Sequence, residues 1–103
     1  MLYDVMLTFD LKAFERYEDL NKTLKDELGF SVSFEKDGQE YHFPENTYFA
    51  KFSDEKYESK EALTIFLTNK LKKIFGKLNV NGSCAFLIDK TEESEVNGNA
   101  FEF

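Results

Sequence analysis

The spacing of hydrophobic residues changes several times along this 103-residue chain, and the order of the changes limits the folds open to it. Segments 12–28 and 60–75 place apolar residues every three or four positions, which is typical of helices with one buried face. Other segments alternate apolar with polar residues or run as short apolar stretches, which is typical of strands. We therefore predict the order strand, helix, strand, strand, helix, strand. The predicted strands are 2–11, 30–35, 41–52 and 83–88.

Turn and cap residues mark where these segments end. Gly29 and Gly76 follow the last apolar residue of each predicted helix, where the left-handed C-cap conformation suits glycine. Ser59 is placed to cap the second helix at its N-terminus. Asp37-Gly38 favours a tight turn between two antiparallel strands. Pro44 has no amide hydrogen to donate, so we expect an edge or a bulge where it interrupts the returning strand.

The order of segments is the split βαβ pattern of the ferredoxin-like fold. The sequence predicts an α+β, βαββαβ domain over residues 1–89, with one four-stranded antiparallel sheet and both helices on one of its faces. One point stays open within it. Leu78–Ile88 is compatible with a single strand that starts at Ser83 or with a small hairpin that turns at Asn81-Gly82.

The C-terminal segment differs from the rest of the chain in its hydrophobic spacing. Residues 90–103 lose the regular hydrophobic spacing and are predicted to be an acidic flexible tail. Phe101 and Phe103 close it, with one residue between them. They either fray or add a short strand to a partner's sheet, at the edge of a dimer.

Composition and charge exclude several classes of protein. Hydrophobic residues make up 42% of the chain, enough for a packed core, and the net charge of −7 excludes a generally basic nucleic-acid coat. The apolar run Ala85–Ile88 is far shorter than the roughly 20 residues of a membrane-spanning helix, and the first residues do not resemble a secretion signal. The single Cys84 cannot form an internal disulfide and is predicted to be a small buried apolar residue. We therefore expect a cytoplasmic protein that contacts no membrane.

Three single residues are candidates for catalysis. Asp10 ends the first predicted strand; it either caps the following turn or binds a metal, with two copies sharing one Mg²⁺ across a dimer axis. His42 is the only histidine, and either serves in general acid–base chemistry near neutral pH or is a surface bystander. Arg16 is the only arginine, and either forms helical ion pairs or contacts phosphate.

Positive charge gathers at one place in this acidic chain, on the last turns of the second predicted helix. Cations are favourable near a helix C-terminus, which explains the cluster without a ligand. The alternative is a nucleic-acid-binding patch that contacts phosphates. The sequence has no Cys/His metal-ligand spacing, glycine-rich phosphate loop or Ser-His-Asp arrangement, which disfavours those enzyme classes. The residues of this lysine patch are Lys70, Lys72, Lys73 and Lys77.

Two stretches resemble a known group of proteins. Tyr3–Asp10 looks like a first strand that ends in an aromatic residue and an aspartate, and Pro44–Phe49 is similar to the ENSF stretch of a third strand. The group is the small ferredoxin-like endoribonucleases, which include the CRISPR-associated dimeric nuclease subunits and the GhoS-type antitoxins. The order of segments agrees over residues 2–89. The resemblance implies a homodimer that cleaves RNA in a toxin–antitoxin or CRISPR-associated setting, with Asp10 at the metal site.

A rival hypothesis is a non-catalytic acidic interaction protein. The chain lacks the broad basic surface of the CRISPR-associated branch, which argues against strong binding to double-stranded DNA. An acidic domain can instead pair through a sheet edge, or present carboxylates in place of phosphates to a basic nucleic-acid-handling protein. Phage-encoded inhibitors of defence nucleases resemble it in composition. One continuous carboxylate face would favour mimicry, whereas a carboxylate pair near a dimer axis and beside the lysine patch would favour a nuclease.

Overall fold

The computed structural model describes residues 2–12, 17–44, 46–90 and 97–103. Its main sheet has four strands in the order β4-β1-β5-β6, and each neighbouring pair is antiparallel. A second sheet is the two-stranded hairpin β2-β3. The strands and helices are β1 (Leu2–Leu11), α1 (Tyr17–Leu28), β2 (Ser33–Lys36), β3 (Gln39–His42), β4 (Thr47–Ser53), α2 (Lys60–Leu78), β5 (Gly82–Lys90) and β6 (Asn97–Glu102).

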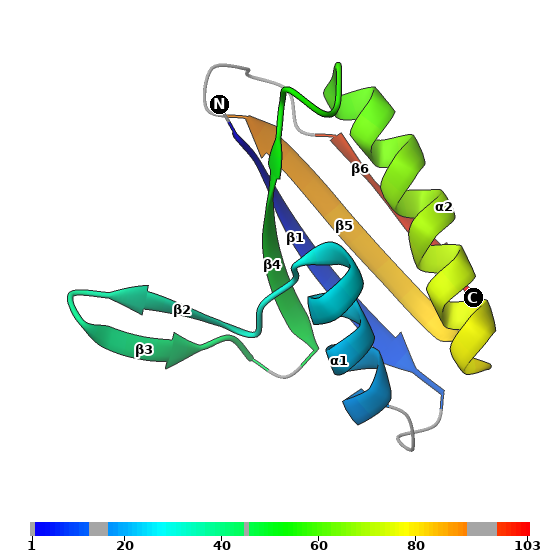
Figure 1. Ribbon diagram of the computed structural model, residues 1–103. Helices are drawn as coiled ribbons and strands as arrows, with labels where there is room; N and C mark the ends of the chain where they lie inside the picture. The colour runs from blue at the N-terminus through cyan, green and yellow to red at the C-terminus, as the bar shows by residue number, and fades with distance from the viewer. Residues whose placement is uncertain (1, 13–16, 45, 91–96) are drawn as a thin grey trace.

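Both helices pack on one face of the main sheet (Figure 1). Buried and exposed residues alternate along β1, so every second side chain points into the layer beneath the helices. A four-stranded antiparallel sheet under two helices confirms the predicted α+β class. In the part of the chain described, neither α1 nor α2 is long and apolar enough to cross a membrane. Side chains with no exposed surface at the centre of the core are Val5, Leu7, Leu20, Leu24, Leu63, Leu67, Leu71 and Ile88.

The strands that make up the sheet differ from the prediction. The second predicted strand, 30–35, and the first limb of the third were expected inside the main sheet. The structure places β2 and β3 in a separate hairpin that stands away from the sheet (Figure 1). Among the described residues, one isolated bridge between Ser31 and Phe49 links this segment to β4. The fourth place in the sheet belongs to β6, on the far side of β5.

The two strands of the hairpin pair with each other and contact each other through aromatic side chains. Val32 and Phe34 were expected to face the core with Phe30, and they are instead 44% and 45% exposed. Phe34 stacks on Tyr41 across the hairpin, with 5.5 Å between ring centroids.

Of the two turns that bound the hairpin, the one at Asp37-Gly38 follows the prediction. Asp37 and Gly38 have φ angles of 52° and 78°, as expected for the two central residues of a tight hairpin turn. At the other end, the Thr47 amide donates to the Pro44 carbonyl at 3.1 Å, and Asn46 takes a positive φ of 71° inside that turn. The strand is interrupted at Pro44 as expected, but by a turn between β3 and β4 and not by the predicted edge or bulge.

Three of the predicted helix ends can be checked. Gly29 has a φ of 75° directly after α1, which confirms it as the C-cap. The Ser59 side chain accepts a hydrogen bond from the Ala62 amide at 3.0 Å, which confirms the N-cap of α2. The prediction that Gly76 ends α2 was wrong. The helix continues to Leu78, and Asn79 takes the left-handed conformation because asparagine tolerates it well.

Two further details of the helices differ from the prediction. The first helix was predicted over 12–28, and the described helix begins at Tyr17; residues 13–16 lie outside the described part of the chain. Phe66 was predicted in the buried stripe of α2 and is 37% exposed. It lies against Tyr57 at the edge of the core, with 5.1 Å between ring centroids.

The structure decides the two questions that the sequence left open, which are the form of Leu78–Ile88 and the placement of Phe101 and Phe103. Leu78 belongs to α2 and β5 is one strand, so the hairpin interpretation of Leu78–Ile88 was wrong. Residues 97–102 form β6, which pairs with β5 of the same chain, so this end of the chain neither frays nor joins a partner's sheet as predicted. Phe101 and Phe103 both pack against the core, and the ring of Phe103 stacks on Phe75 with 3.8 Å between centroids.

Candidate interaction surface

The face of the main sheet that points away from the helices is covered by no described part of the chain. Its side chains come from every second position of β1, β4, β5 and β6. The β1 residues Leu2 and Met6 are 47% and 45% exposed on it, and Leu87 of β5 is 60% exposed. Large apolar side chains at these levels of exposure mark a surface that can bind another molecule. We call this surface the open face.

Three of the apolar side chains form a row across the open face. Met6 is in register with Phe49 on one side and with Leu87 on the other. Neighbouring strands in a sheet lie about 4.8 Å apart, so these side chains stand next to one another. We call Phe49, Met6 and Leu87 the apolar ridge.

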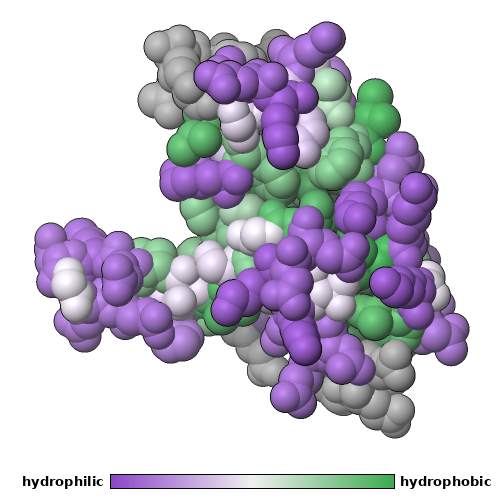
Figure 2. Space-filling view, in the orientation of Figure 1, coloured by the Kyte–Doolittle hydropathy of each residue, from purple (hydrophilic) through white to green (hydrophobic). Residues whose placement is uncertain are grey.

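The hairpin extends the ridge. Phe43 contacts Phe49 with 6.4 Å between ring centroids, and Phe34 contacts Phe43 at 5.4 Å. Since Phe34 also stacks on Tyr41, aromatic contacts run without a break from the hairpin to the open face. Figure 2 shows hydrophilic residues at the outer end of the hairpin. An isolated two-stranded hairpin is marginally stable in water, so contact of its aromatic side with a partner would stabilise it.

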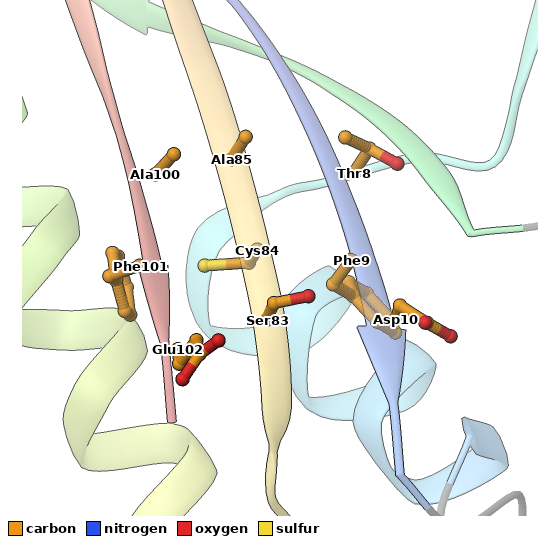
Figure 3. Close-up of a pocket in the computed structure, with 9 residues that line it drawn as sticks. All are labelled: Thr8, Phe9, Asp10, Ser83, Cys84, Ala85, Ala100, Phe101 and Glu102. Carbon is orange, nitrogen blue, oxygen red and sulfur yellow. The ribbon is translucent and has the colours of Figure 1, made fainter.

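A hollow lies beside the ridge on the same face. Small side chains floor it, because Ala85 of β5 pairs with Ala100 of β6 and with Thr8 of β1. Its volume is about 480 Å³. Figure 3 shows the row at its lower end, in which Asp10 and Glu102 flank Ser83 on three adjacent strands.

The candidate residues of the sequence lie in different places. Asp10 is exposed on the open face, next to the hollow. His42 is exposed at the end of β3, where its Nε2 lies 3.0 Å from a Glu40 carboxylate oxygen. Arg16 lies outside the described residues. The structure therefore does not bring Asp10 and His42 together within one chain.

The lysine patch belongs to the other layer of the molecule, since α2 covers the opposite face of the sheet from Asp10 (Figure 1). Lys70 forms an ion pair with Glu27 of α1 at 3.1 Å. The Lys72 ammonium lies 5.4 Å from the ring centroid of Phe101, a cation–π contact. Lys73 and Lys77 are exposed. Asp10 and the helix that carries the lysine patch therefore lie on opposite sides of the sheet.

Glu102 was missed by the sequence interpretation. It lies in the C-terminal segment that was taken as a tail, and only the pairing of Ser83 with Glu102 brings it beside Asp10. The alternation of Phe101, Glu102 and Phe103 was the available signal, because it is the spacing of a strand with one buried face. Among the described residues, no group of three or more His, Cys, Asp or Glu side chains is arranged to hold a metal ion.

Cys84 is buried, as predicted, and has no partner sulfur. Burial raises the pKa of its thiol to about 11, because the interior disfavours the charged thiolate. The thiol is therefore protonated at neutral pH, and we assign Cys84 no nucleophilic role.

Comparisons with known proteins identify no relative. No protein-family model, no curated protein and no solved structure matches this chain. The functional argument therefore depends on the open face and the groups around it.

Proposed function

We propose that this chain is a protein-interaction module that forms a homodimer through the open face. The supporting observation is that the apolar ridge and the hollow lie side by side on that one face. In a dimer with two-fold symmetry the same patch of both copies meets, so the patch must be complementary to itself. An apolar row next to a hollow floored by small residues suits this requirement, and in the proposed dimer each ridge packs in the partner's hollow.

In this proposal the hairpin forms part of the interface beside the ridge. Its aromatic side is continuous with the ridge through the contact of Phe43 with Phe49. A second copy on the open face would therefore meet the base of the hairpin as well, and would cover aromatic surface that is exposed in the single chain. Phe34 and Tyr41 are the exposed aromatic residues that this contact would bury.

A further partner of the dimer would be basic. The net charge is −7, and exposed acids such as Glu35, Asp37 and Glu40 lie on the hairpin. Such a surface attracts a positively charged partner over long range and speeds its association. We propose a basic nucleic-acid-handling protein in this role.

The substitution Leu87→Glu tests the dimer. A carboxylate buried in the interface without a partner should weaken self-association roughly 100-fold. Ile65→Glu is the matched control, since Ile65 on α2 is 63% exposed and Leu87 is 60% exposed. Sedimentation equilibrium of the full chain measures the dissociation constant of each variant. A monomeric wild type, or equal effects of the two substitutions, would refute a dimer on the open face.

The second candidate function is metal-dependent RNA cleavage by a dimer whose two-fold axis passes near Asp10, which is an alternative to the packing of each ridge in the partner's hollow. It is favoured by the position of Asp10 and Glu102 on one hollow, because carboxylate oxygens are the ligands that Mg²⁺ prefers. Two copies of Asp10 near a dimer axis could share one ion with water and activate a nucleophile for phosphodiester hydrolysis. This candidate function assumes the proposed relationship to the CRISPR-associated and GhoS-type endoribonucleases.

That relationship includes a ferredoxin-like origin of the sheet. The strands β5, β1 and β4 are adjacent in that order, which corresponds to the last, first and third strands of a βαββαβ unit. The bridge between Ser31 and Phe49 marks the place of the second strand beside β4. We propose that β6 was added to this unit and that its second strand became the hairpin.

Cleavage of a mixed cellular RNA pool tests the second candidate. We expect Mg²⁺-dependent cleavage that a chelator abolishes and that Asp10→Asn lowers by at least roughly 100-fold. Asp89→Asn is the control, since Asp89 is exposed on the same face and does not line the hollow. A well-folded dimer that leaves the RNA intact would eliminate this function. Cleavage that survives both the chelator and Asp10→Asn would instead direct attention to His42 and Arg16.

A further inference from the structure

The outer edge of β6 is a second surface that can bind another chain. β6 is the last strand of the main sheet, and no described strand pairs with the side of it that faces away from β5. The opposite edge of the sheet is partly covered, because Ser31 bridges to Phe49 of β4. An uncovered edge presents backbone N–H and C=O groups that an extended chain can pair with.

The hydrogen bonds at the C-terminus show which backbone groups of β6 point outward. Gly82 and Phe103 exchange backbone hydrogen bonds in both directions, and the Gly82 amide donates to the Phe103 carbonyl at 2.7 Å. Such pairs alternate along an antiparallel ladder, so every second residue of β6 turns its N–H and C=O groups away from β5. The residues with outward backbone groups are Gly98, Ala100 and Glu102.

The chain satisfies one of these outward groups itself. The Ala100 amide donates to the side-chain Oδ1 of Asn99 at 2.8 Å. The same Asn99 side chain donates through Nδ2 to the Thr68 hydroxyl of α2 at 3.2 Å. The Ala100 amide therefore has a local partner that a bound strand would replace with a backbone carbonyl.

α2 shelters this edge on the covered side of the sheet. In Figure 3 the coils of α2 reach past β6, on the side away from β5. The contacts between the two elements follow the strand, from Thr68 with Asn99 to Lys72 with Phe101. A strand added beside β6 would therefore place every second side chain beneath α2.

The side of α2 above this edge is apolar at one end and positive at the other. Ile65, Thr68 and Lys72 are spaced by three and four positions, so they form one stripe along the helix. Ile65 is 63% exposed, and the Lys72 ammonium forms no ion pair with any described residue. The other lysines of the lysine patch add to the positive potential here. A strand with an apolar and an acidic side chain on this side would complement the stripe.

We propose that the outer edge of β6 binds an extended acidic segment of a partner protein as an added antiparallel strand. The side chain opposite Phe101 is acidic and meets Lys72. The side chain opposite Asn99 is apolar and meets Ile65. The site uses neither the apolar ridge nor the hairpin, so it goes beyond the proposed dimer.

A second copy of this chain fits the edge less well than an acidic segment. Two β6 edges paired about a two-fold axis would place both α2 helices on the same side of the joined sheet. The two lysine patches would then lie near each other, and like charges repel. The positive stripe therefore favours a partner of opposite charge.

Fluorescence anisotropy of the full chain with a labelled synthetic peptide tests this edge. The acetylated peptide Val-Thr-Glu-Thr-Val-Thr-Val can place its glutamate opposite Phe101 and its central threonine opposite Ala100. N-methylation of the central threonine removes a donor that points at the Ala100 carbonyl and should weaken binding roughly tenfold. N-methylation of the glutamate removes an N–H that points away from β6 and should change the affinity less than about twofold.

Lys72→Gln tests the charged contact. It should weaken binding of the glutamate peptide roughly threefold at low salt, and added salt should reduce the difference. It should leave unchanged the affinity of a peptide with glutamine in place of the glutamate. Lys73→Gln is the matched control, because Lys73 points about 100° away from Lys72 around the helix. Equal losses in the two lysine variants would refute the contact with Lys72.

Ala100→Pro tests the edge from the side of the protein. Proline is tolerated on an edge strand where its missing N–H would face away from the sheet, so β6 can keep its pairing with β5. The variant should lose peptide binding, whereas Leu87→Glu should bind the peptide as the wild type does. Wild-type affinity of a folded Ala100→Pro, equal effects of the two N-methylations, or no binding at millimolar protein would overturn the proposal. If Ala100→Pro unfolds, the two N-methylated peptides decide the question on the wild-type chain.

Discussion

Gly82→Ala is expected to destabilise the fold by about 3 kcal/mol, a large effect for a single methyl group. A Cβ at position 82 would lie 2.1 Å from the carbonyl oxygen of Asp10. That oxygen belongs to the backbone of β1, so it cannot rotate away as a side chain would. Gly82 is also tied to the C-terminus, since its amide donates to the Phe103 carbonyl at 2.7 Å. Relief of the clash therefore requires β1, β5 and the C-terminal segment to separate locally.

Urea unfolding followed by circular dichroism measures this free energy, and Gly76→Ala is the matched control. Gly76 lies inside α2, and apart from its chain neighbours and the backbone of its own helix a Cβ there would meet no described atom within 4 Å. Alanine is the better helix former, so this substitution should stabilise the protein by about 0.5–1 kcal/mol. The two glycine-to-alanine changes should thus have opposite signs. A Gly82→Ala variant as stable as the wild type would contradict the close approach of β5 to β1.

Local signals in the sequence were reliable. The left-handed conformations of Gly29, Asp37 and Gly38, and the N-cap at Ser59, follow from residues within a few positions of each other. Each is fixed by the backbone freedom or hydrogen bonding of the residue itself, so no knowledge of the rest of the fold is required. The end of α2 was missed because Asn79 can take the same conformation as glycine.

The composition of the sheet could not be predicted in this way. Val32 and Phe34 show the alternation of a strand with an apolar face, but the alternation does not say what covers that face. In the structure, Phe34 on that face contacts Tyr41 and Phe43 of the same hairpin. The strand β6 was missed because its first residues show no apolar alternation. Asn97–Asn99 is polar and is held by backbone pairing with β5.

The candidate site was predicted in part. The sequence placed Asp10 at the end of a strand, and alternation along β1 puts it on the face opposite to Phe9. The same reasoning applied to α2 separates the lysine patch from Asp10, because the helix covers the other face. Glu102 could not be found before the pairing of β5 with β6 was known, since it lies 92 positions from Asp10 in the sequence.

Phe9→Ala is the second large effect, and we expect it to destabilise the fold by about 4 kcal/mol. Phe9 is buried where α1, α2 and β4 meet over β1. Its ring stacks on Tyr48 at 4.9 Å and on Tyr17 at 5.6 Å between centroids, and it meets Phe75 edge-on at 6.4 Å. Truncation removes a side chain that contacts three elements and leaves a cavity that none of these rings can fill without losing another contact.

Chemical denaturation of Phe9→Ala beside Phe66→Ala separates this role from the general cost of removing an aromatic ring. Phe66 is 37% exposed and its ring contacts Tyr57 at the edge of the core, so its truncation should cost only about 1 kcal/mol. If the two variants lost similar amounts of unfolding free energy, Phe9 would not have the central role in the core that we expect. Because Asp10 follows Phe9 in β1, the packing of this one ring also fixes the strand end that presents the carboxylate to the hollow. Any function of Asp10 should therefore be lost in Phe9→Ala at denaturant concentrations that leave the wild type folded.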